Sequence, residues 1–392
     1  MKIKNGGHYD VAVCGGGFGG ISAALAAARE GKKVILLEKQ YMLGGLGTAG
    51  LVTIYLPLCD GLGHQVSFGI AEELLKLSIT YGAEARYPEN WLDGVGSRTE
   101  KDKRYEVQYN AQVFAILAEQ LLLREGVEIL YGTYVVDVAV SGGRITELLV
   151  ENKSGRQSIA VGSVVDATGD CDIAHFAGAP TDTFKQGNVL AAWYYFTDEK
   201  GYQLKMLGAS DIPEEEKNGR ERKTLVNRRF TGLDGRELTD MTVLSHETTL
   251  NDWLKRREEN PNAVISTIAT MPQVRMTRRI VGEYELSHVE EHTYFEDSIG
   301  MVSNWKKRGP VWEVPFRTLY SKAVKNLITA GRCTSVNETL WDVMRVIPCC
   351  AVTGQAAGLA AAMTDDFSTL DVKELQEKLV QNGVVLHEKD LG

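Results

Sequence analysis

The chain has 392 residues, 44% of them hydrophobic, which is enough apolar material for a large packed core. Aspartate and glutamate total 52 against 43 for lysine and arginine, and the formal net charge of −9 disfavours a nucleic acid or an anionic membrane surface as a partner. The apolar runs are short, no charged-then-apolar leader opens the sequence, and the six cysteines are widely scattered, so we expect a cytoplasmic protein with reduced thiols.

The first forty residues follow the pattern of a strand, a helix and a second strand. Residues 9–14, YDVAVC, predict a buried strand, and residues 32–39, KKVILLEK, predict another. Between them, GGGFGG predicts a tight turn, and the small-residue stretch 21–31 predicts a helix closed by Gly31. Together these segments form one βαβ unit, which favours a parallel sheet covered by helices.

The turn of this unit fits the fingerprint GxGxxG. Gly15 makes the turn, Gly17 lets a pyrophosphate approach the backbone, and Gly20 lets the helix and strand pack closely. The amides at the helix N-terminus then face the phosphates, where the helix dipole favours negative charge. Glu38 ends the second strand, where an acid is expected to accept hydrogen bonds from a ribose. The pattern predicts a dinucleotide site, and both NAD and FAD satisfy it.

Four later stretches narrow this choice. A second glycine cluster, KQYMLGGLGTAGLV, occupies residues 39–52, and VEILYGTYVVDVAV occupies 127–140. SVVDATGDCDIAHFAGA occupies 163–179, and a strand, a loop and a small-residue helix follow one another through 326–363. With these motifs the sequence resembles the FAD-dependent oxidoreductase family, stand-alone bacterial flavoproteins of the glutathione-reductase-like superfamily. The resemblance extends over nearly the whole chain.

The resemblance implies FAD as the cofactor, with the second glycine cluster around its pyrophosphate and ribityl chain. It implies a strand over 127–140 whose backbone contacts the adenine at Val135. It also implies that the chain re-enters the cofactor domain at Thr168, and that a strand ending at Gly331 leads into the last long helix. The cofactor-binding residues predicted by the fingerprint and the resemblance are Gly15, Gly16, Gly17, Phe18, Gly19, Gly20, Glu38, Lys39, Gly44, Gly45, Leu46, Thr48, Val135, Ala167, Thr168, Gly169, Asp170, Gly331, Arg332 and Pro348. No metal site is predicted.

The predicted fold is α/β, a Rossmann-like FAD-binding domain with a parallel sheet and helices. Residues 1–190, with cap elements around 60–110, and residues 323–392 are expected to form this domain. Residues 191–322 break the βαβ rhythm, so we expect an inserted mixed α+β substrate domain there.

Two loops are candidates for catalysis because their flanks are expected to touch the cofactor. The loop 59–68 contributes Cys59 and His64, and the loop 337–345 contributes Glu338, Asp342 and Arg345. In the second loop the sequence departs from the resemblance, because Val336-Asn337-Glu338 stands where many relatives have Ser-His-Glu. Arg345 is expected to bind the substrate if the substrate is anionic.

Two short patterns also have chemical interpretations. His288 to His292, HVEEH, has the spacing of an inverted zinc-protease motif, although no third ligand is evident. The adjacent pair Cys349 and Cys350 could form a redox disulfide, although vicinal cysteines rarely bridge. Buried thiols and unliganded histidines are the simpler interpretation of both.

The predicted activity is hydride transfer between a small polar metabolite, such as an alcohol, sugar or amine, and the flavin. Two alternatives remain at this point. One is a reductase or redox-neutral enzyme acting on an activated double bond, and the other is a non-catalytic dinucleotide-binding protein. The electron acceptor is unknown, and a homo-oligomer is left open.

Overall fold

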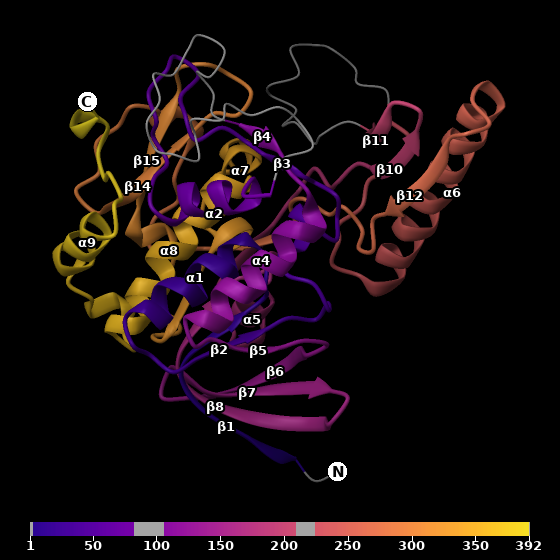
Figure 1. Cartoon of the computed structure of the whole chain (residues 1–392). Helices are drawn as coiled ribbons and strands as arrows, with labels where there is room; N and C mark the ends of the chain where they lie inside the picture. Colours follow the sequence, from indigo (N-terminus) through magenta and orange to yellow (C-terminus); the bar gives the residue numbers. More distant parts are fainter. Residues whose placement is uncertain (1–2, 82–105, 209–223, 392) are drawn as a thin grey trace.

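The computed structural model describes residues 3–81, 106–208 and 224–391, and a seven-stranded sheet lies at its base (Figure 1). The strands are β1 (Lys4–Cys14), β2 (Val34–Leu37), β5 (Glu128–Leu130), β6 (Tyr134–Ser141), β7 (Arg144–Asn152), β8 (Gly155–Asp166) and β16 (Leu327–Thr329). Their order is β5-β2-β1-β8-β7-β6, and β16 pairs with the end of β8. β5, β2, β1, β8 and β16 run parallel to one another. β7 pairs antiparallel with β8 on one side and with β6 on the other. The predicted βαβ unit and Rossmann-like sheet are confirmed.

Successive side chains at the end of β1 are buried on opposite faces of the sheet. Val11 and Val13 pack with the helices α1 (Phe18–Arg29), α4 (Ala111–Arg124) and α8 (Ile347–Met363). Ala12 and Cys14 point the other way and pack with side chains of β7 and of the short helix α5 (Asp172–Phe176). Because successive side chains of a strand point to opposite faces, the short run 11–14 anchors both layers.

The helices α1 and α8 lie against each other with almost no side chain between them. A Cβ atom at Gly354 would lie 2.3 Å from the Gly19 carbonyl oxygen, and one at Gly358 would lie 2.1 Å from the Ala23 carbonyl oxygen. Only glycine fits at either position. The small residues of α8 therefore bring its first turn up to the glycine turn that precedes α1.

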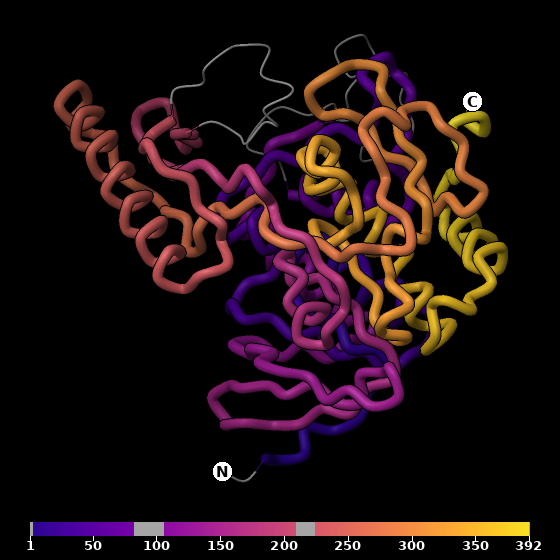
Figure 2. The backbone as a smooth tube through the Cα atoms, turned by 180° about the vertical axis from the view of Figure 1, so that it is seen from behind, coloured from indigo at the N-terminus to yellow at the C-terminus, as the bar shows by residue number. Residues whose placement is uncertain are grey.

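The segment after β8 builds a separate small sheet. β10 (Ala192–Asp198) pairs with β11 (Gly201–Leu207) and β12 (Val264–Ile268), all antiparallel, and α6 (Gly235–Glu259) packs on β10. The Asp234 side chain caps α6 by accepting hydrogen bonds from the amides of Arg236 and Glu237. Figures 1 and 2 show α6 and this sheet set to one side of the main body.

Short paired strands and peripheral helices complete the body. β9 pairs with β13, β14 with β15, and β3 with β4, and α9 packs beside β14. The bounds are β3 (Ile54–Tyr55), α2 (Ile70–Ser78), β4 (Val107–Gln108), β9 (Thr181–Thr183), β13 (Arg278–Ile280), β14 (Ser298–Ser303), β15 (Val311–Pro315), α7 (Glu338–Met344) and α9 (Val372–Gln381).

Two predicted elements differ from the structure in their bounds. The helix expected from residue 21 begins at Phe18, inside the glycine turn. The strand expected over 127–140 is two strands, β5 and β6, because Gly132 has a φ of +57° and turns the chain between them. The domain bounds 1–190, 191–322 and 323–392 stay a prediction, and residues 82–105 of the expected cap elements lie outside the described residues.

Within the described ranges, no single helix is long and apolar enough to cross a membrane. The helices α7 and α8, bent by 89° at the break between them, meet that criterion as a pair by length and composition alone. Most of their side chains are buried inside the molecule.

Candidate cofactor and active site

A cavity of about 790 Å³ opens where the parallel strands end. Its walls include Cys14 at the end of β1, Leu37 at the end of β2, Ala167 after β8 and Ala330 after β16. In open α/β sheets, ligands bind outside the carboxyl ends of the strands, and pockets for small molecules and cofactors span roughly 300–1,000 Å³. The position and the size of this cavity both fit a dinucleotide.

The glycine turn after β1 forms one wall of the cavity. Gly15 has a φ of +104°, and a Cβ atom there would lie 2.4 Å from the Ala167 carbonyl oxygen. A Cβ atom at Gly20 would lie 1.8 Å from the Gly15 carbonyl oxygen, so Gly20 serves packing. At Gly17 a Cβ atom would meet nothing within 4 Å, and Gly17 lines the cavity. Gly17 is therefore the position where a phosphate can reach the backbone.

A second glycine turn lies beside the first. The Gly44 amide donates to the Gly16 carbonyl oxygen at 2.7 Å, and Gly44 has a φ of +99°. The Thr48 hydroxyl donates to the Leu43 carbonyl oxygen and holds this turn closed. Gly44 and Gly45 line the cavity. The backbone of two separate turns is thus presented to the same space, as wrapping a pyrophosphate requires.

Glu38 joins these turns to the second strand. It is 5% exposed and lines the cavity, and its carboxylate accepts hydrogen bonds from the amides of Gly16, at 2.6 Å, and Gln40, at 2.7 Å. Burial raises the pKa of Glu38 above its ordinary value, although the hydrogen bonds from the two amides act in the opposite direction. A buried carboxylate fixed in this way can accept hydrogen bonds from ribose hydroxyls.

Val135 of β6, Lys39 and the α5 residues Asp172, His175 and Phe176 also line the cavity. Together with the glycine turns and Glu38, they form what is called the nucleotide half of the cavity below. Burial, with a contribution from neighbouring acids, raises the pKa of Asp172 to about 6. Sequence reasoning missed the three α5 residues, although the motif at 163–179 contains them. The signal was their position directly after the turn formed by residues 167–170, Ala-Thr-Gly-Asp, which is called the ATGD turn below.

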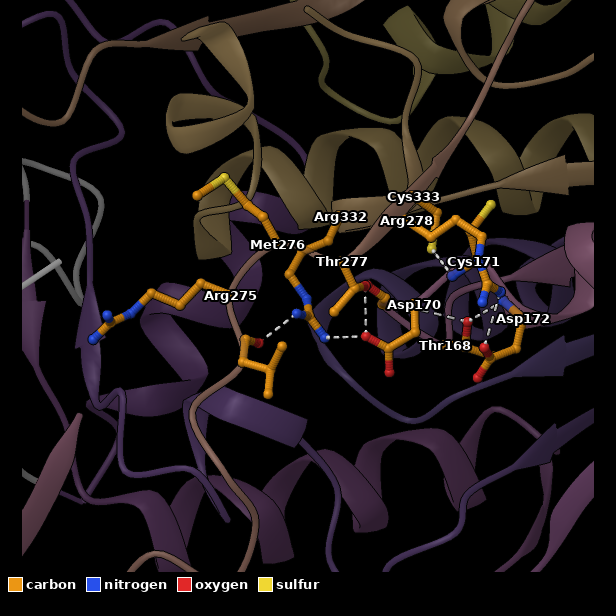
Figure 3. A network of polar contacts seen from close by, with 12 residues as sticks. Thr168, Asp170, Cys171, Asp172, Arg275, Met276, Thr277, Arg278, Arg332 and Cys333 are labelled. Atoms are coloured by element: carbon orange, nitrogen blue, oxygen red, sulfur yellow. Dashed lines mark hydrogen bonds and ion pairs between the residues drawn. The ribbon is translucent and has the colours of Figure 1, made fainter. Parts of the chain in front are cut away.

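A polar network surrounds Asp170 and Arg332, two residues that line the cavity (Figure 3). The guanidinium of Arg332 donates to the Val274 carbonyl oxygen at 2.6 Å and lies 3.7 Å from the Asp170 carboxylate. The Thr277 hydroxyl donates to the same carboxylate at 2.8 Å. Gly169 has a φ of +80°, which favours glycine, and a Cβ atom there would lie 2.2 Å from Arg332 Nη2 and would displace this guanidinium. The network ties the ATGD turn to the segment that follows β12.

Other residues of the cavity wall come from distant parts of the chain. Ile347 and Cys350 come from the first turn of α8, and Arg345 comes from the turn before it. Leu233 and Met271 come from the loops that flank α6 and β12. Sequence reasoning missed Leu233 and Met271, because no local motif marks them and the tertiary fold alone brings them here.

Arg345 is held in place by a buried carboxylate. Asp342 is fully buried, and its Oδ1 accepts hydrogen bonds from Nε of Arg345, at 3.0 Å, and from Nη2 of the same guanidinium. Its Oδ2 lies 2.9 Å from Lys306 Nζ. Burial alone raises the pKa of Asp342, but the charges of Arg345 and Lys306 outweigh burial and lower it.

The structure brings together most of the predicted cofactor-binding residues. Those that line the cavity are Gly15, Gly17, Phe18, Gly19, Glu38, Lys39, Gly44, Gly45, Leu46, Val135, Ala167, Thr168, Gly169, Asp170, Gly331 and Arg332. Gly16, Gly20, Thr48 and Pro348 lie just behind this surface. Gly16 faces Leu43 and Glu38, and Pro348 lies between the lining residues Ile347 and Cys350.

Of the five predicted catalytic residues, only Arg345 lines the cavity. Asp342 lies beneath Arg345, as described above. The Glu338 carboxylate accepts hydrogen bonds from the amides of Lys185, at 2.7 Å, and Gln186, at 3.2 Å, so it anchors a neighbouring loop. Asn337, at the position of the departure from the family pattern, caps α7.

The other two predicted catalytic residues belong to a separate loop. Cys59 is 1% exposed. The His64 ring is exposed, and its Nδ1 lies 2.8 Å from the Asp60 carboxylate. This loop packs on another part of the chain, because the Gly309 amide donates to the Asp60 carbonyl oxygen. The loop 59–68 therefore does not contribute to the cavity.

Two sequence patterns remain, the HVEEH stretch at 288–292 and the adjacent pair Cys349 and Cys350. His288 contacts Asn337, whereas His292 contacts Glu388. No group of three or more potential metal ligands occurs in the part of the chain that the structure describes. All six cysteines are buried thiols, and burial raises the pKa of Cys350 to about 12. A thiol that remains protonated is a weak nucleophile.

The parallel sheet, with paired glycine turns at its strand ends, defines a Rossmann-type dinucleotide-binding protein. The model of the family described as FAD dependent oxidoreductase matches residues 10–192 and 182–379. The chain belongs to this family. The family is one of FAD-dependent oxidoreductases, and FAD is the cofactor.

Two curated proteins are similar to parts of the chain. A vinyl phenol reductase from Lactiplantibacillus plantarum is 28% identical over 196 residues, 43% of this chain and 39% of that protein. A thioredoxin reductase from Ureaplasma parvum is 32% identical over 77 residues, 20% of this chain and 25% of that protein. The matched regions thus span less than half the length of these relatives. Among solved structures, a geranylgeranyl bacteriochlorophyll reductase-like protein from Thermoplasma acidophilum is 13% identical with a TM-score of 0.48, covering 98% of this chain and 85% of that chain.

Proposed function

We propose that this enzyme transfers a hydride between a small polar metabolite, such as an alcohol, sugar or amine, and the flavin. The observation that carries the proposal is the continuity of one cavity. Its walls include both glycine turns and also Leu233, Met271, Arg345 and Ile347. We place the substrate at the part of the cavity that these four residues line, which is called the substrate end below.

Bound FAD supplies a two-electron carrier to this site. The chain holds and orients it: Glu38 and the amides of the glycine turns would bind the nucleotide half, and Gly169 leaves room for the guanidinium of Arg332. The N-terminus of α8 faces the cavity at Ile347 and Cys350, where the helix dipole stabilises negative charge. Leu233 and Met271 would exclude water from the reacting atoms.

A second candidate is the reduction of an activated double bond at the same site. The partial similarity to a vinyl phenol reductase favours it. Both candidates use the same cavity and differ in the direction of hydride transfer.

The test is an anaerobic titration of the oxidised holoenzyme, followed at the flavin absorption band. Bleaching by an alcohol, sugar or amine supports metabolite oxidation. Bleaching by NADH or NADPH alone, followed by reoxidation with an activated alkene, supports the second candidate. Failure of every donor to bleach the flavin, with dithionite as the positive control, would reject both.

The surroundings of the enzyme are also part of the proposal. Six buried thiols are compatible with a reducing compartment, so a cytoplasmic location is proposed. We propose a small-molecule substrate as its partner and neither a nucleic acid nor a membrane surface, which the net charge of −9 disfavours. The electron acceptor and a homo-oligomer remain open parts of this proposal.

A further inference from the structure

Arg345, one of the cations that line the cavity, is held in a fixed position. Its side chain is only 9% exposed. Two of its nitrogens, Nε and Nη2, are directed at Asp342 Oδ1. No acceptor for its third nitrogen, Nη1, is found among the described residues. One edge of the guanidinium is thus anchored, which leaves Nη1 to bind a ligand.

Asp342 does not neutralise Arg345 by itself. Its second oxygen, Oδ2, lies 2.9 Å from Lys306 Nζ, so one carboxylate is shared by two cations. Asp342 is fully buried, and Lys306 does not line the cavity. Arg345 therefore presents positive charge to the cavity while its own position is fixed from below.

Apolar side chains line the same cavity as Arg345, among them Leu46, Leu233, Met271 and Ile347. The Trp305 ring lies 6.0 Å from the carbon of the Arg345 guanidinium. An apolar, water-poor environment strengthens a charge-assisted hydrogen bond compared with one in bulk water. The substrate end therefore suits a ligand that combines an apolar body with a single anionic group.

We propose that the substrate carries a carboxylate, which binds to Arg345 while the carbon skeleton packs against the apolar wall. This inference rests on the proposed function, and it restricts the substrate class to hydroxy, amino or unsaturated acids. A planar carboxylate can accept hydrogen bonds from the side of the guanidinium that carries Nη1, and the charge of Arg345 balances its single negative charge. Arg332 also lines the cavity, but it lies 3.7 Å from the carboxylate of Asp170. Asp342 and Lys306 act as positioning residues for Arg345.

The test measures ligand binding to the oxidised holoenzyme by the change in its flavin absorption spectrum. The probes are benzoate and the smaller propionate, each compared with its neutral amide, benzamide or propionamide. At least one carboxylate should bind saturably, and its amide should bind at least tenfold more weakly. Arg345→Gln should remove this preference, and Arg345→Lys should retain part of it because the charge remains but the fork is lost.

A matched control is Arg317→Gln, which removes an ion pair with Asp297 at a residue that does not line the cavity. It should leave the preference unchanged. Equal affinity for acid and amide, no binding of either acid, or full acid preference in Arg345→Gln with wild-type FAD content would each overturn the inference. If Arg345→Gln loses FAD, the Arg345→Lys variant is measured instead. Unchanged preference for the acid over its amide, together with unchanged affinity for the acid, would then refute the role of the guanidinium.

This test is separate from the test of the proposed function. If a neutral alcohol reduces the flavin equally in the wild type and in Arg345→Gln, hydride transfer stands and the carboxylate inference fails. If the acids bind through Arg345 but no donor reduces the flavin, the inference about the ligand stands and the proposed function fails.

Discussion

The first prediction concerns Gly17→Ala, in which the added methyl group should weaken FAD binding while the stability of the folded apoprotein is kept. Gly17 has φ −70° and ψ −179°, a conformation that alanine adopts without strain. A Cβ atom there would meet no protein atom within 4 Å and would project into the cavity. Gly17→Ala weakens the N-cap of α1 but also restricts the unfolded chain, and these effects of roughly 0.5–1 kcal/mol oppose each other. The apoprotein should therefore keep its stability to within about 1 kcal/mol.

The cofactor should respond differently, because the methyl group occupies the space through which a phosphate reaches the backbone amides. Loss of one hydrogen bond to a charged group costs about 1.5–3 kcal/mol. At about 1.4 kcal/mol per tenfold change, the dissociation constant for FAD should rise roughly 10- to 150-fold.

The assay is reconstitution of the apoprotein with FAD, followed by flavin fluorescence, together with thermal melting of the apoprotein. Gly20→Ala is the contrasting variant: its Cβ atom would lie 1.8 Å from the Gly15 carbonyl oxygen, so the melting temperature itself should fall. Gly235→Ala is the neutral control, since a Cβ atom there meets nothing within 4 Å and the residue does not line the cavity. Wild-type FAD affinity in Gly17→Ala would refute the placement of the phosphates.

Three further predictions follow from the carboxylates. Glu38→Ala should weaken FAD binding at least tenfold, because charge-assisted hydrogen bonds to the ribose are lost, and retention of FAD after dialysis at micromolar cofactor would contradict this role. The pKa of Asp172 is raised from 3.8 to about 6, so its contribution to stability is full below pH 4 and is lost as the pH rises through about 6. The melting temperature of the Asp172→Asn apoprotein should therefore rise relative to that of the wild type as the pH increases from 4 to 8. A difference that stays constant with pH would argue against the raised pKa of Asp172. Glu338→Ala should lower the melting temperature, because the amides of Lys185 and Gln186 lose their acceptor, and should change flavin reduction less than threefold; a hundredfold slower reduction in a stable variant would restore a catalytic role.

The sequence by itself determined the nucleotide half of the site, because its signals are local. A phosphate-binding turn needs glycine at fixed spacings after a strand, so Gly15, Gly17 and Gly20 are visible within six residues. The acid at Glu38 follows from the end of the next strand. Gly44 and Thr168 were predicted by the resemblance to the FAD-dependent oxidoreductase family, which the second glycine cluster and the motif at 163–179 carry.

The catalytic residues were predicted from loop position, and four of the five do not line the cavity. Glu338 and Asp342 stand between two segments that touch the cavity, so the expectation placed their carboxylates there. The short helix α7 instead directs Asp342 inward to two cations and Glu338 outward to the amides of Lys185 and Gln186. The orientation of a side chain on a helix depends on its neighbours in space, and only Arg345, at the end of α7, is left to line the cavity.

The substrate end was decided by the tertiary structure alone. Leu233 and Met271 are separated from α8 by long stretches of sequence and carry no motif, yet they line the same cavity as Arg345 and Ile347. Arg332 and Thr277 tie the chain after β12 to the ATGD turn. Gly232, next to Leu233, packs against Val274 and Thr277 of that segment. Cofactor binding relies on backbone turns that each short segment encodes for itself, whereas this wall forms only where distant segments pack together.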